Sequence, residues 1–334
     1  MKKIILPAYN KNILRAIYSL RTADAKIPQP GENEVLIQVH GAPCNPSDIA
    51  FMTGGYNIVK SLPAVPGFEG SGRIIEAGEG AEHLIGSKVS FFVQADGDGS
   101  WSEYVCTTKN NIVVLDEALD MDQAACFAVN PFTARGLLDI ALLRENKAII
   151  QNAAGSQVAA FVRQMAKELN IQVIDIVRKQ ERKESLLKEG AEYVLLENEE
   201  NFDEKLADLS RQLDARLAFD AVGGSLSGSI LNAMPANAEL VIYGGLSTKP
   251  ISGVRTMDLI FDDKVISGFN LPAWRQMLDD DYFEEISLDM QQRFIRGDYQ
   301  TRIQGSTDFE HIINGLTDYI RKMSEGKVLI KPSV

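Results

Sequence analysis

The sequence has few of the residues that hold metals and disulfides. Its 334 residues include only three cysteines and three histidines, and no Cys-x-x-Cys pair occurs. The cysteines stand far apart, at Cys44, Cys106 and Cys126. The histidines are too widely spaced for a local ligand cluster, at His40, His83 and His311. These absences argue against a disulfide scaffold and a histidine-based metal site, and they favour a reducing, cytoplasmic location.

The chain also lacks an excess of positive charge and a long apolar run. Lysine and arginine number 34 against 46 aspartates and glutamates, which gives a formal net charge of −12. Nucleic acids and anionic membranes need clustered lysine and arginine, so neither is an expected partner. No stretch approaches the length of about 20 apolar residues that a membrane helix needs. The apolar N-terminal run stops at Pro7, too early for a signal peptide, and predicts a first strand.

What is present is the composition of an ordinary globular protein, 45% apolar and 24% charged. A chain of this length can bury a large core and most often forms two domains. The first third is rich in glycine, proline and short β-like runs, which predicts a compact, irregular β domain. Strands are expected there at 34–39, 70–76, 88–93 and 103–107.

From about residue 120 the pattern changes to helices and then to alternating strands and helices. Helices are expected over 121–128 and 132–143, with a break at Asn130 and Pro131 between them. Further strands are expected at 148–151, 171–177, 193–196, 217–222 and 239–243. This alternation predicts a doubly wound parallel sheet. The tail predicts a helix over 308–324 and a strand at 327–330 that fold back onto the first domain.

The segment from Lys147 to Arg178 carries the most specific signal. A buried strand leads into small residues at 153–156, then an amphipathic helix over 158–169 and a second strand. This βαβ unit has the length that a dinucleotide site needs. A loop without large side chains lets backbone N–H groups approach a pyrophosphate at the helix N-terminus. The loop does not have the Gly-x-Gly-x-x-Gly pattern. Ala159 stands at the position of the third glycine, where a small residue such as alanine is tolerated.

An arginine, Arg178, ends the second strand, directly after Val177. A site for NAD normally places an acidic residue here, on the ribose 2′-hydroxyl, whereas an arginine suits a 2′-phosphate. The sequence therefore predicts NADPH as the cofactor. The alternative is that Arg178 simply faces water, as most arginines after a strand do.

Three segments carry a family resemblance: Asn45-Pro46-Ser47-Asp48, residues 62–70, and Asn130-Pro131-Phe132-Thr133-Ala134. They resemble the medium-chain dehydrogenase/reductase superfamily, and the similarity extends over essentially the whole chain. Within it, the chain is most similar to the zinc-free branch of quinone oxidoreductases and NADPH-dependent 2-enoyl thioester reductases. The features that carry this are Gly54-Gly55-Tyr56, the loop at 151–156, residues 176–178, Tyr243-Gly244-Gly245 and the segment 268–274.

The resemblance implies an α/β plus β fold, in which a GroES-like β-rich catalytic domain packs against a Rossmann domain with a doubly wound parallel sheet. The nicotinamide would lie in the cleft between them. We expect the catalytic domain over residues 1–122, the NADPH-binding domain over 123–268, and a return segment over 269–334 that packs back on the catalytic domain. Members of the superfamily pair through the edge of the Rossmann sheet. A homodimer through the strand-like segment 264–269 is therefore expected, with a monomer as the alternative.

The resemblance also argues against zinc. Zinc alcohol dehydrogenases of the superfamily have a cysteine where this chain has Asn45, and Gly-His-Glu where it has Gly67-Phe68-Glu69. Asparagine and phenylalanine do not replace a thiolate and an imidazole, and a catalytic zinc needs about three protein ligands. We therefore expect no metal at this position.

Without a metal, catalysis requires a donor for the charge that develops on the substrate oxygen. Hydride transfer to Cβ of a 2-enoyl thioester builds an enolate, and a tyrosine stays protonated at neutral pH and can donate to it. Tyr56 matches the tyrosine of the enoyl thioester reductases. The alternative is that Tyr56 serves binding only, since quinone reductases often carry a tyrosine in this region.

The resemblance assigns the remaining site residues one position at a time. Asn45 and Trp274 are expected to contact substrate. Cofactor contacts are expected from Asn130, Thr133, Gly155, Ser156, Gln157, Val158, Arg178, Tyr243, Gly244, Gly245, Phe269, Asn270, Leu271 and Lys327. Two departures matter. Asn270 stands where enoyl reductases usually show tryptophan, which puts long-chain acyl specificity in doubt. Gln157 and Ala159 replace glycines, which could weaken cofactor affinity.

The leading hypothesis is a zinc-independent, NADPH-dependent reductase that transfers hydride to an activated C=C bond, such as a 2-enoyl thioester, or to a quinone. The alternative is an NADPH-binding, crystallin-like protein with little turnover. A nucleophilic hydrolase is a distant third, because the three histidines offer no Ser-His-Asp grouping.

Overall fold

The chain forms two compact units in the computed structural model, which describes residues 1–94 and 97–332. The first unit comprises Met1–Val129 and Asp280–Val334, and the second comprises Asn130–Asp279. Residues 123–129, expected in the Rossmann domain, thus belong to the first unit. Residues 269–279, expected in the return segment, belong to the second.

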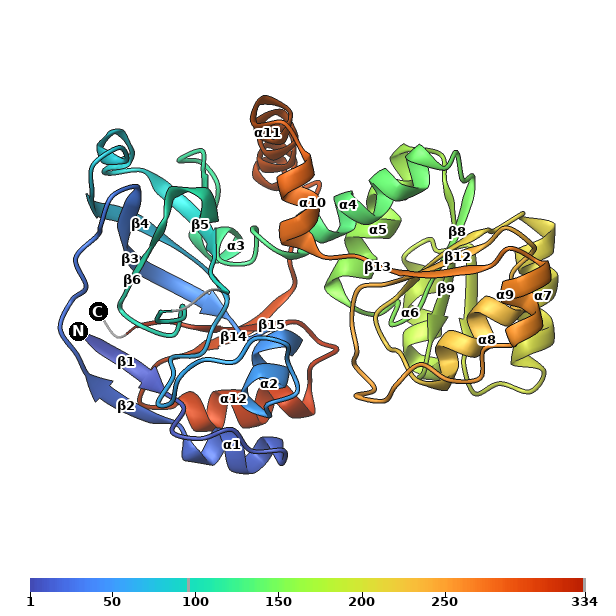
Figure 1. Ribbon diagram of the computed structural model, residues 1–334, viewed down its shortest axis with the longest axis horizontal. Helices are drawn as coiled ribbons and strands as arrows, with labels where there is room; N and C mark the ends of the chain where they lie inside the picture. The colour runs from blue at the N-terminus through green and yellow to red at the C-terminus, as the bar shows by residue number, and fades with distance from the viewer. Residues whose placement is uncertain (95–96, 333–334) are drawn as a thin grey trace. The chain divides into compact units, whose positions relative to one another are not determined.

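A mixed sheet organises the first unit, with strand order β14-β15-β3-β4-β5-β7 and β6 paired with β3 (Figure 1). Its strands are β3 (Glu34–Pro43), β4 (Glu69–Ala77), β5 (Lys88–Phe92), β6 (Tyr104–Thr108), β7 (Ile112–Val114), β14 (Ile303–Thr307) and β15 (Lys327–Ile330). A separate antiparallel pair is formed by β1 (Lys2–Ile5) and β2 (Arg21–Asp24). The C-terminal β15 pairs antiparallel with β3, which confirms that the tail folds back onto the first part of the chain.

Apolar side chains cover both faces of this sheet. One core is formed by Val35, Ile37, Val39, Ile74, Val89 and Phe91, and the other includes Phe51, Phe68, Trp101 and Leu316. The helices are α1 (Ile13–Ser19), α2 (Pro46–Met52), α3 (Met121–Ala124), α11 (Asp280–Arg296) and α12 (Ile312–Arg321), with 3-10 turns η1 (Glu82–Leu84) and η2 (Lys109–Asn111). The tail helix was predicted over 308–324 and is shorter in the structure, where α12 begins after its N-cap, His311. The Asp308 carboxylate accepts the backbone N–H of His311 and so lies before the helix.

A six-stranded parallel sheet organises the second unit, in the order β10-β9-β8-β11-β12-β13. Its strands are β8 (Ala148–Gln151), β9 (Gln172–Val177), β10 (Tyr193–Leu196), β11 (Leu217–Asp220), β12 (Glu239–Ile242) and β13 (Val265–Gly268). The connecting helices are α4 (Asn130–Leu143), α5 (Gln157–Glu168), α6 (Gln180–Lys188), α7 (Phe202–Gln212), α8 (Ser225–Ala233), α9 (Thr256–Phe261) and α10 (Leu271–Met277). From β8 the chain adds β9 and β10 on one side, and it then adds β11, β12 and β13 on the other side. The strand order therefore reverses between β8 and β11. Ligands of such sheets bind at the carboxyl ends of the strands near this reversal.

The predicted fold class is confirmed, and one local prediction is wrong. Asn130 and Pro131 do not interrupt a helix, because α4 begins at Asn130 and contains Pro131 in its first turn. Proline is tolerated there, since a first-turn N–H has no acceptor within the helix. The helix expected over 121–128 is also shorter, because α3 ends at Ala124. In the described part of the chain, no helix combines the length and apolarity that a membrane crossing requires.

Candidate functional site

The turn from β8 into α5 has the geometry of an anion-binding loop. Ala153 has a φ of 45°, which bends the chain sharply before the helix. Ser156 is the N-cap of α5, and its hydroxyl accepts the backbone N–H of Ala159 at 3.2 Å. The predicted residues Gly155 to Val158 therefore lie at the N-terminus of a twelve-residue helix, where backbone N–H groups and the helix dipole favour a phosphate.

Arg182 lies against Gly155, so a side chain at Gly155 would displace it. A Cβ at this position would be 2.9 Å from Arg182 Nε and 3.2 Å from its Cδ. Arg182 is in the first turn of α6, four residues after the exposed Arg178. Two arginines thus follow β9, one of them directly against the predicted pyrophosphate loop. Arg182 is not among the residues that the sequence predicted for the site, although its spacing from Arg178 at the start of a helix is a local feature of the sequence.

Arg178 also has an acidic neighbour on the adjacent strand. Glu197 follows β10, which pairs with β9. Burial raises the pKa of the Glu197 carboxyl, and the positive charge of Arg178 partly offsets that rise. Arg178 is therefore close enough to Glu197 for their charges to interact, although its side chain is exposed, so its role toward the cofactor stays a prediction.

A hydrogen bond joins Tyr243, directly after β12, to Ser156 in the loop. Burial and the nearby Asp220 raise the pKa of Tyr243, so its hydroxyl stays protonated at neutral pH. The next residue, Gly244, must be small, because a Cβ there would lie 2.8 Å from the carbonyl oxygen of Ala221. Gly245 borders open space. The structure thus brings the predicted segment 243–245 beside the predicted loop.

Asp220 holds the carboxyl ends of β8 and β11 together. Its Oδ1 accepts hydrogen bonds from Asn152 at 2.5 Å and from the backbone N–H of Gly223 at 2.9 Å. Its Oδ2 accepts the Ser227 hydroxyl at 2.5 Å. Sequence analysis did not single out this buried carboxylate, which fixes the two strands where the strand order reverses.

Asn130 and Thr133 are both buried at the start of α4. Within the described residues, the Asn130 side-chain nitrogen has no hydrogen-bond partner despite its burial. A buried donor without an acceptor costs about 1–3 kcal/mol, so such a group usually serves a ligand or water. The carboxamide oxygen of a nicotinamide is an acceptor of the required kind.

The segment after β13 packs on α4. Asn270 caps α10 by accepting the backbone N–H of Ala273 at 3.0 Å, between Phe269 and Leu271. A Cβ on Gly136 of α4 would lie 2.6 Å from the Phe269 ring. Trp274 is only 5% exposed, and its indole N–H donates to Asp139 at 3.0 Å. The structure gives Trp274 a packing role, and its contact with substrate stays a prediction.

Tyr56 lies in the first unit, in the loop that follows α2. It is half-buried, and its ring packs at 5.4 Å from the ring of Phe68, the residue that replaces a zinc-ligating histidine. Gln94 donates a hydrogen bond from Nε2 to the Tyr56 hydroxyl oxygen at 2.9 Å. Burial raises the pKa of Tyr56, so the phenol is protonated at neutral pH.

Asn45, Glu69 and Lys327 form a buried polar network in the same unit. The Asn45 side-chain nitrogen donates to Glu69 at 2.9 Å, and Lys327 donates to the Asn45 side-chain oxygen. Asp48 accepts the backbone N–H groups of Asn45 and Phe68. Burial raises the pKa of Asp48 and of Glu69 to about 7, and the Lys327 ammonium opposes both shifts.

This network bears on two predicted roles. Asn45 is 4% exposed and Lys327 is 7% exposed, and their polar groups are bonded to each other. Contact of Asn45 with substrate and of Lys327 with phosphate therefore remain predictions, for which these side chains would have to exchange their present partners. Across residues 1–94 and 97–332, no three histidine, cysteine, aspartate or glutamate side chains gather as metal ligands.

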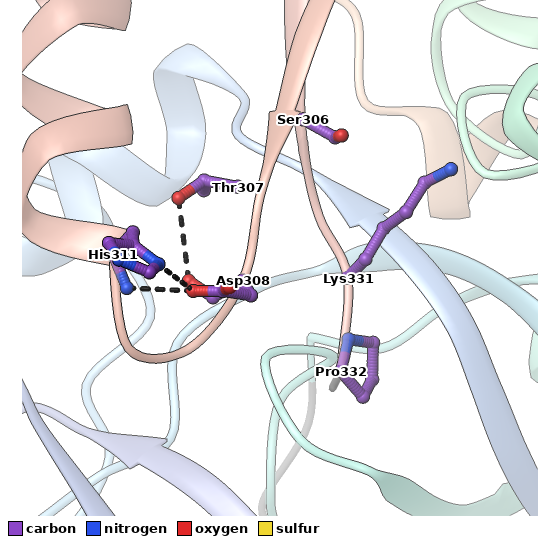
Figure 2. A pocket seen from close by; sticks show the side chains of 6 residues that line it. All are labelled: Ser306, Thr307, Asp308, His311, Lys331 and Pro332. Carbon is purple, nitrogen blue, oxygen red and sulfur yellow. Dashed lines mark hydrogen bonds and ion pairs between the residues drawn. The ribbon is translucent and has the colours of Figure 1, made fainter. Parts of the chain in front are cut away.

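An open pocket of about 470 Å³ lies elsewhere in the first unit, between the ends of β14 and β15 and the start of α12. Figure 2 shows that Asp308 and His311 turn toward each other while Lys331 points away from them. Lys331 is paired with Asp122, and His311 with Asp308. Since none of the predicted site residues lines this pocket, it carries no part of the functional argument.

Comparison with known proteins agrees with this arrangement. The alcohol dehydrogenase GroES-like domain family matches residues 31–117, and the zinc-binding dehydrogenase family matches residues 158–287. Mitochondrial enoyl-[acyl-carrier-protein] reductase of Xenopus tropicalis is 34% identical over 263 residues, which cover 77% of this chain and 74% of that protein.

Two solved structures resemble the chain over nearly its full length. A Mesorhizobium loti protein assigned as an NADPH:quinone reductase has a TM-score of 0.90 at 32% identity, covering 99% of this chain and 98% of that one. A mitochondrial 2-enoyl thioester reductase heterodimer of Candida tropicalis shares the fold, with a TM-score of 0.78 at 23% identity and 99% coverage of both chains. The chain therefore belongs to the medium-chain dehydrogenase/reductase superfamily of oxidoreductases, in the branch that its sequence predicts.

Proposed function

We propose that the protein is a zinc-independent, NADPH-dependent reductase of an activated C=C bond, such as a 2-enoyl thioester, or of a quinone. The observation that carries this proposal is the loop at 153–156, which combines a helix N-terminus with an arginine held against Gly155. The enoyl reductase and quinone reductase names of the relatives support the reaction type.

The residues of the second unit fit NADPH. The loop and the first turn of α5 would hold the pyrophosphate, and Arg178 with Arg182 would hold the 2′-phosphate by charge-assisted hydrogen bonds. The buried Asn130 donor would meet the carboxamide. When bound, the nicotinamide supplies the hydride.

The first unit supplies the donor for the oxygen of the substrate. Tyr56 is protonated at neutral pH, and a hydrogen bond from its hydroxyl would stabilise the enolate that forms as the thioester accepts hydride. The position of a zinc-ligating histidine holds Phe68, which cannot bind a metal. We therefore expect turnover to survive prolonged chelation and the purified protein to carry no stoichiometric zinc by elemental analysis.

A substrate screen tests the proposal. NADPH oxidation is followed by absorbance with a crotonyl thioester, an alkenal and a simple quinone. We expect turnover with at least one of the three and a preference for NADPH over NADH. Tight NADPH binding without turnover on any of them would instead favour the crystallin-like alternative.

We also propose that the protein is a homodimer that pairs through β13, the edge strand of the parallel sheet. Apolar side chains on and beside this edge are exposed: Met257 60%, Ile260 57%, Phe261 75% and Val265 49%. Burying them against a second copy would remove this surface from water and continue the sheet. Light scattering should give twice the 36.8 kDa mass of one chain.

Phe261→Lys should shift that equilibrium to the monomer. Leu143→Lys is the matched control, because Leu143 is 85% exposed at the end of α4, away from the sheet edge in sequence and topology. A wild-type mass of one chain would contradict the dimer.

A cytoplasmic location is the remaining part of the proposal. It is supported by the three unpaired cysteines, whereas several relatives are named mitochondrial. Fractionation of cells that express the full-length protein would distinguish the two locations.

A further inference from the structure

We propose that Gln94 is a positioning residue that sets the Tyr56 hydroxyl to donate its hydrogen to the substrate. This inference rests on the proposed function, because it assigns a partner to the tyrosine that the proposed reaction uses. No motif in the sequence pointed to Gln94, which follows β5 and lies 38 residues from Tyr56.

The geometry of the pair assigns the direction of the hydrogen bond. Gln94 Nε2 donates to the Tyr56 oxygen at 2.9 Å. A phenol has one hydrogen and can also accept, whereas an amide nitrogen only donates. When the oxygen accepts from Gln94, the hydroxyl hydrogen is left to point elsewhere. The same bond stabilises the phenolate, and it lowers the pKa of Tyr56 against the effect of burial.

A buried lysine lies beside the ring on which Tyr56 packs. Lys60 is only 6% exposed, and its ammonium donates to the carbonyl oxygen of Gly97 at 3.0 Å. It also lies 5.8 Å from the centre of the Phe68 ring, on which Tyr56 packs. Lys60 therefore lies against the ring that forms the wall behind Tyr56.

The backbone of Lys60 is itself fixed. Tyr9 donates to the Lys60 carbonyl oxygen at 3.0 Å and accepts the Lys60 N–H at 2.8 Å. The Tyr9 ring packs edge-on against Phe51, which packs in turn against Phe68. The Tyr56 ring is thus held by a packed aromatic cluster, which is the support that a directed hydrogen bond from Gln94 requires.

Two substitutions of Gln94 test the direction of the bond. Gln94→Leu removes the donor and should lower kcat for a crotonyl thioester about tenfold, the size of one hydrogen bond between neutral groups. Gln94→Glu supplies only acceptors, which would draw the hydroxyl hydrogen away from substrate. It should lower kcat about a hundredfold, close to the loss expected for Tyr56→Phe. Gln38→Glu, at an exposed position of β3, is the control and should leave kcat unchanged.

A double-mutant comparison separates positioning through Tyr56 from a general effect on structure. In a Tyr56→Phe background, Gln94→Leu and Gln94→Glu should cause almost no further loss. Losses that persist undiminished in that background, or Gln94 variants that match the Gln38 control, would overturn the inference. The NADPH dissociation constant, measured by fluorescence, should stay unchanged throughout.

A spectroscopic titration tests the same inference without turnover. The phenolate absorbance of the protein minus that of its Tyr56→Phe variant reports the pKa of Tyr56. Gln94→Leu should raise this pKa, and Gln94→Glu should raise it further. An unchanged pKa in both variants would overturn the inference, whereas a wild-type protein without turnover would count against the proposed function alone.

Discussion

The two units hold their polar groups in different ways. In the second unit, the predicted cofactor loop is built from neighbouring residues, and Ser156 closes it by bonding to Ala159 three positions away. In the first unit, the polar groups come from distant parts of the chain, and Lys327 bonds to Asn45 across 282 positions. The loop would bind a cofactor mainly through its backbone, whereas the network of the first unit depends on particular side chains. We therefore expect single substitutions to damage the first unit more.

The largest effect should come from Lys327→Met, which leaves Glu69 and Asp48 buried without their cation. Lys327 bonds to Asn45 and acts on the two carboxyls through its charge, and by analogy with a buried ion pair the loss of this charge should cost about 3–5 kcal/mol. The free energy of unfolding of the first unit should fall by that amount. Trp101, in its core, reports this transition by fluorescence in a Trp274→Phe background.

Lys331→Met provides the matched control four positions later. Lys331 is partly exposed and pairs with Asp122, an interaction worth about 1 kcal/mol or less. The NADPH dissociation constant of Lys331→Met should be unchanged, whereas that of Lys327→Met should rise if Lys327 contacts phosphate as the resemblance implies. Equal stabilities of the two variants would show that the buried network contributes little.

The next largest effect concerns Tyr56→Phe. Loss of a donor used in the transition state typically costs about 10²–10³ in kcat, and we expect that loss with a crotonyl thioester. NADPH binding should change little. Quinone reduction is the internal control, because its product oxygens can take protons from water and should need the hydroxyl less. Equal, small losses with both substrates would remove Tyr56 from catalysis and favour a quinone reductase.

The contrast between the units also explains what the sequence could predict. Strands 148–151, 193–196 and 327–330 were predicted with the bounds that the structure has, because short apolar runs between turn signals are local features. The turn between β8 and α5, the predicted cofactor loop, was placed correctly in the chain for the same reason. The α11 helix was missed, although its first turn carries the acidic residues Asp280 and Asp281 that favour a helix start.

Side-chain partners could not be predicted in the same way. Nothing near Gln94 in sequence indicates that it meets Tyr56, and nothing near Lys327 indicates Asn45. These contacts depend on which strands of the sheet become neighbours, here β15 beside β3. Arg182 is the intermediate case, because its position relative to Arg178 is local but its contact with Gly155 is not.

A smaller effect, on the affinity for NADPH, is expected from Arg178, which follows β9, and from Arg182 on α6. Arg178→Ala and Arg182→Ala should each raise the NADPH dissociation constant about ten- to a hundredfold, since a charge-assisted bond contributes about 1.5–3 kcal/mol. Binding of NADH should change little. Lys183→Ala is the control on the same helix, because Lys183 pairs with Glu199 instead. A wild-type protein that prefers NADH would contradict the assignment.

The smallest effect should be that of Trp274→Phe. This substitution tests whether a side chain of the second unit contacts substrate. The substitution keeps an aromatic ring on Gly136 and removes one hydrogen bond to Asp139, which Arg135 also binds. The cost should be about 1 kcal/mol in the unfolding of the second unit, measured by calorimetry. If Trp274 only packs, KM for the crotonyl thioester stays unchanged. If it contacts substrate as the resemblance implies, KM rises in addition to this loss of stability, and the second unit then contributes more than a backbone cradle to the site.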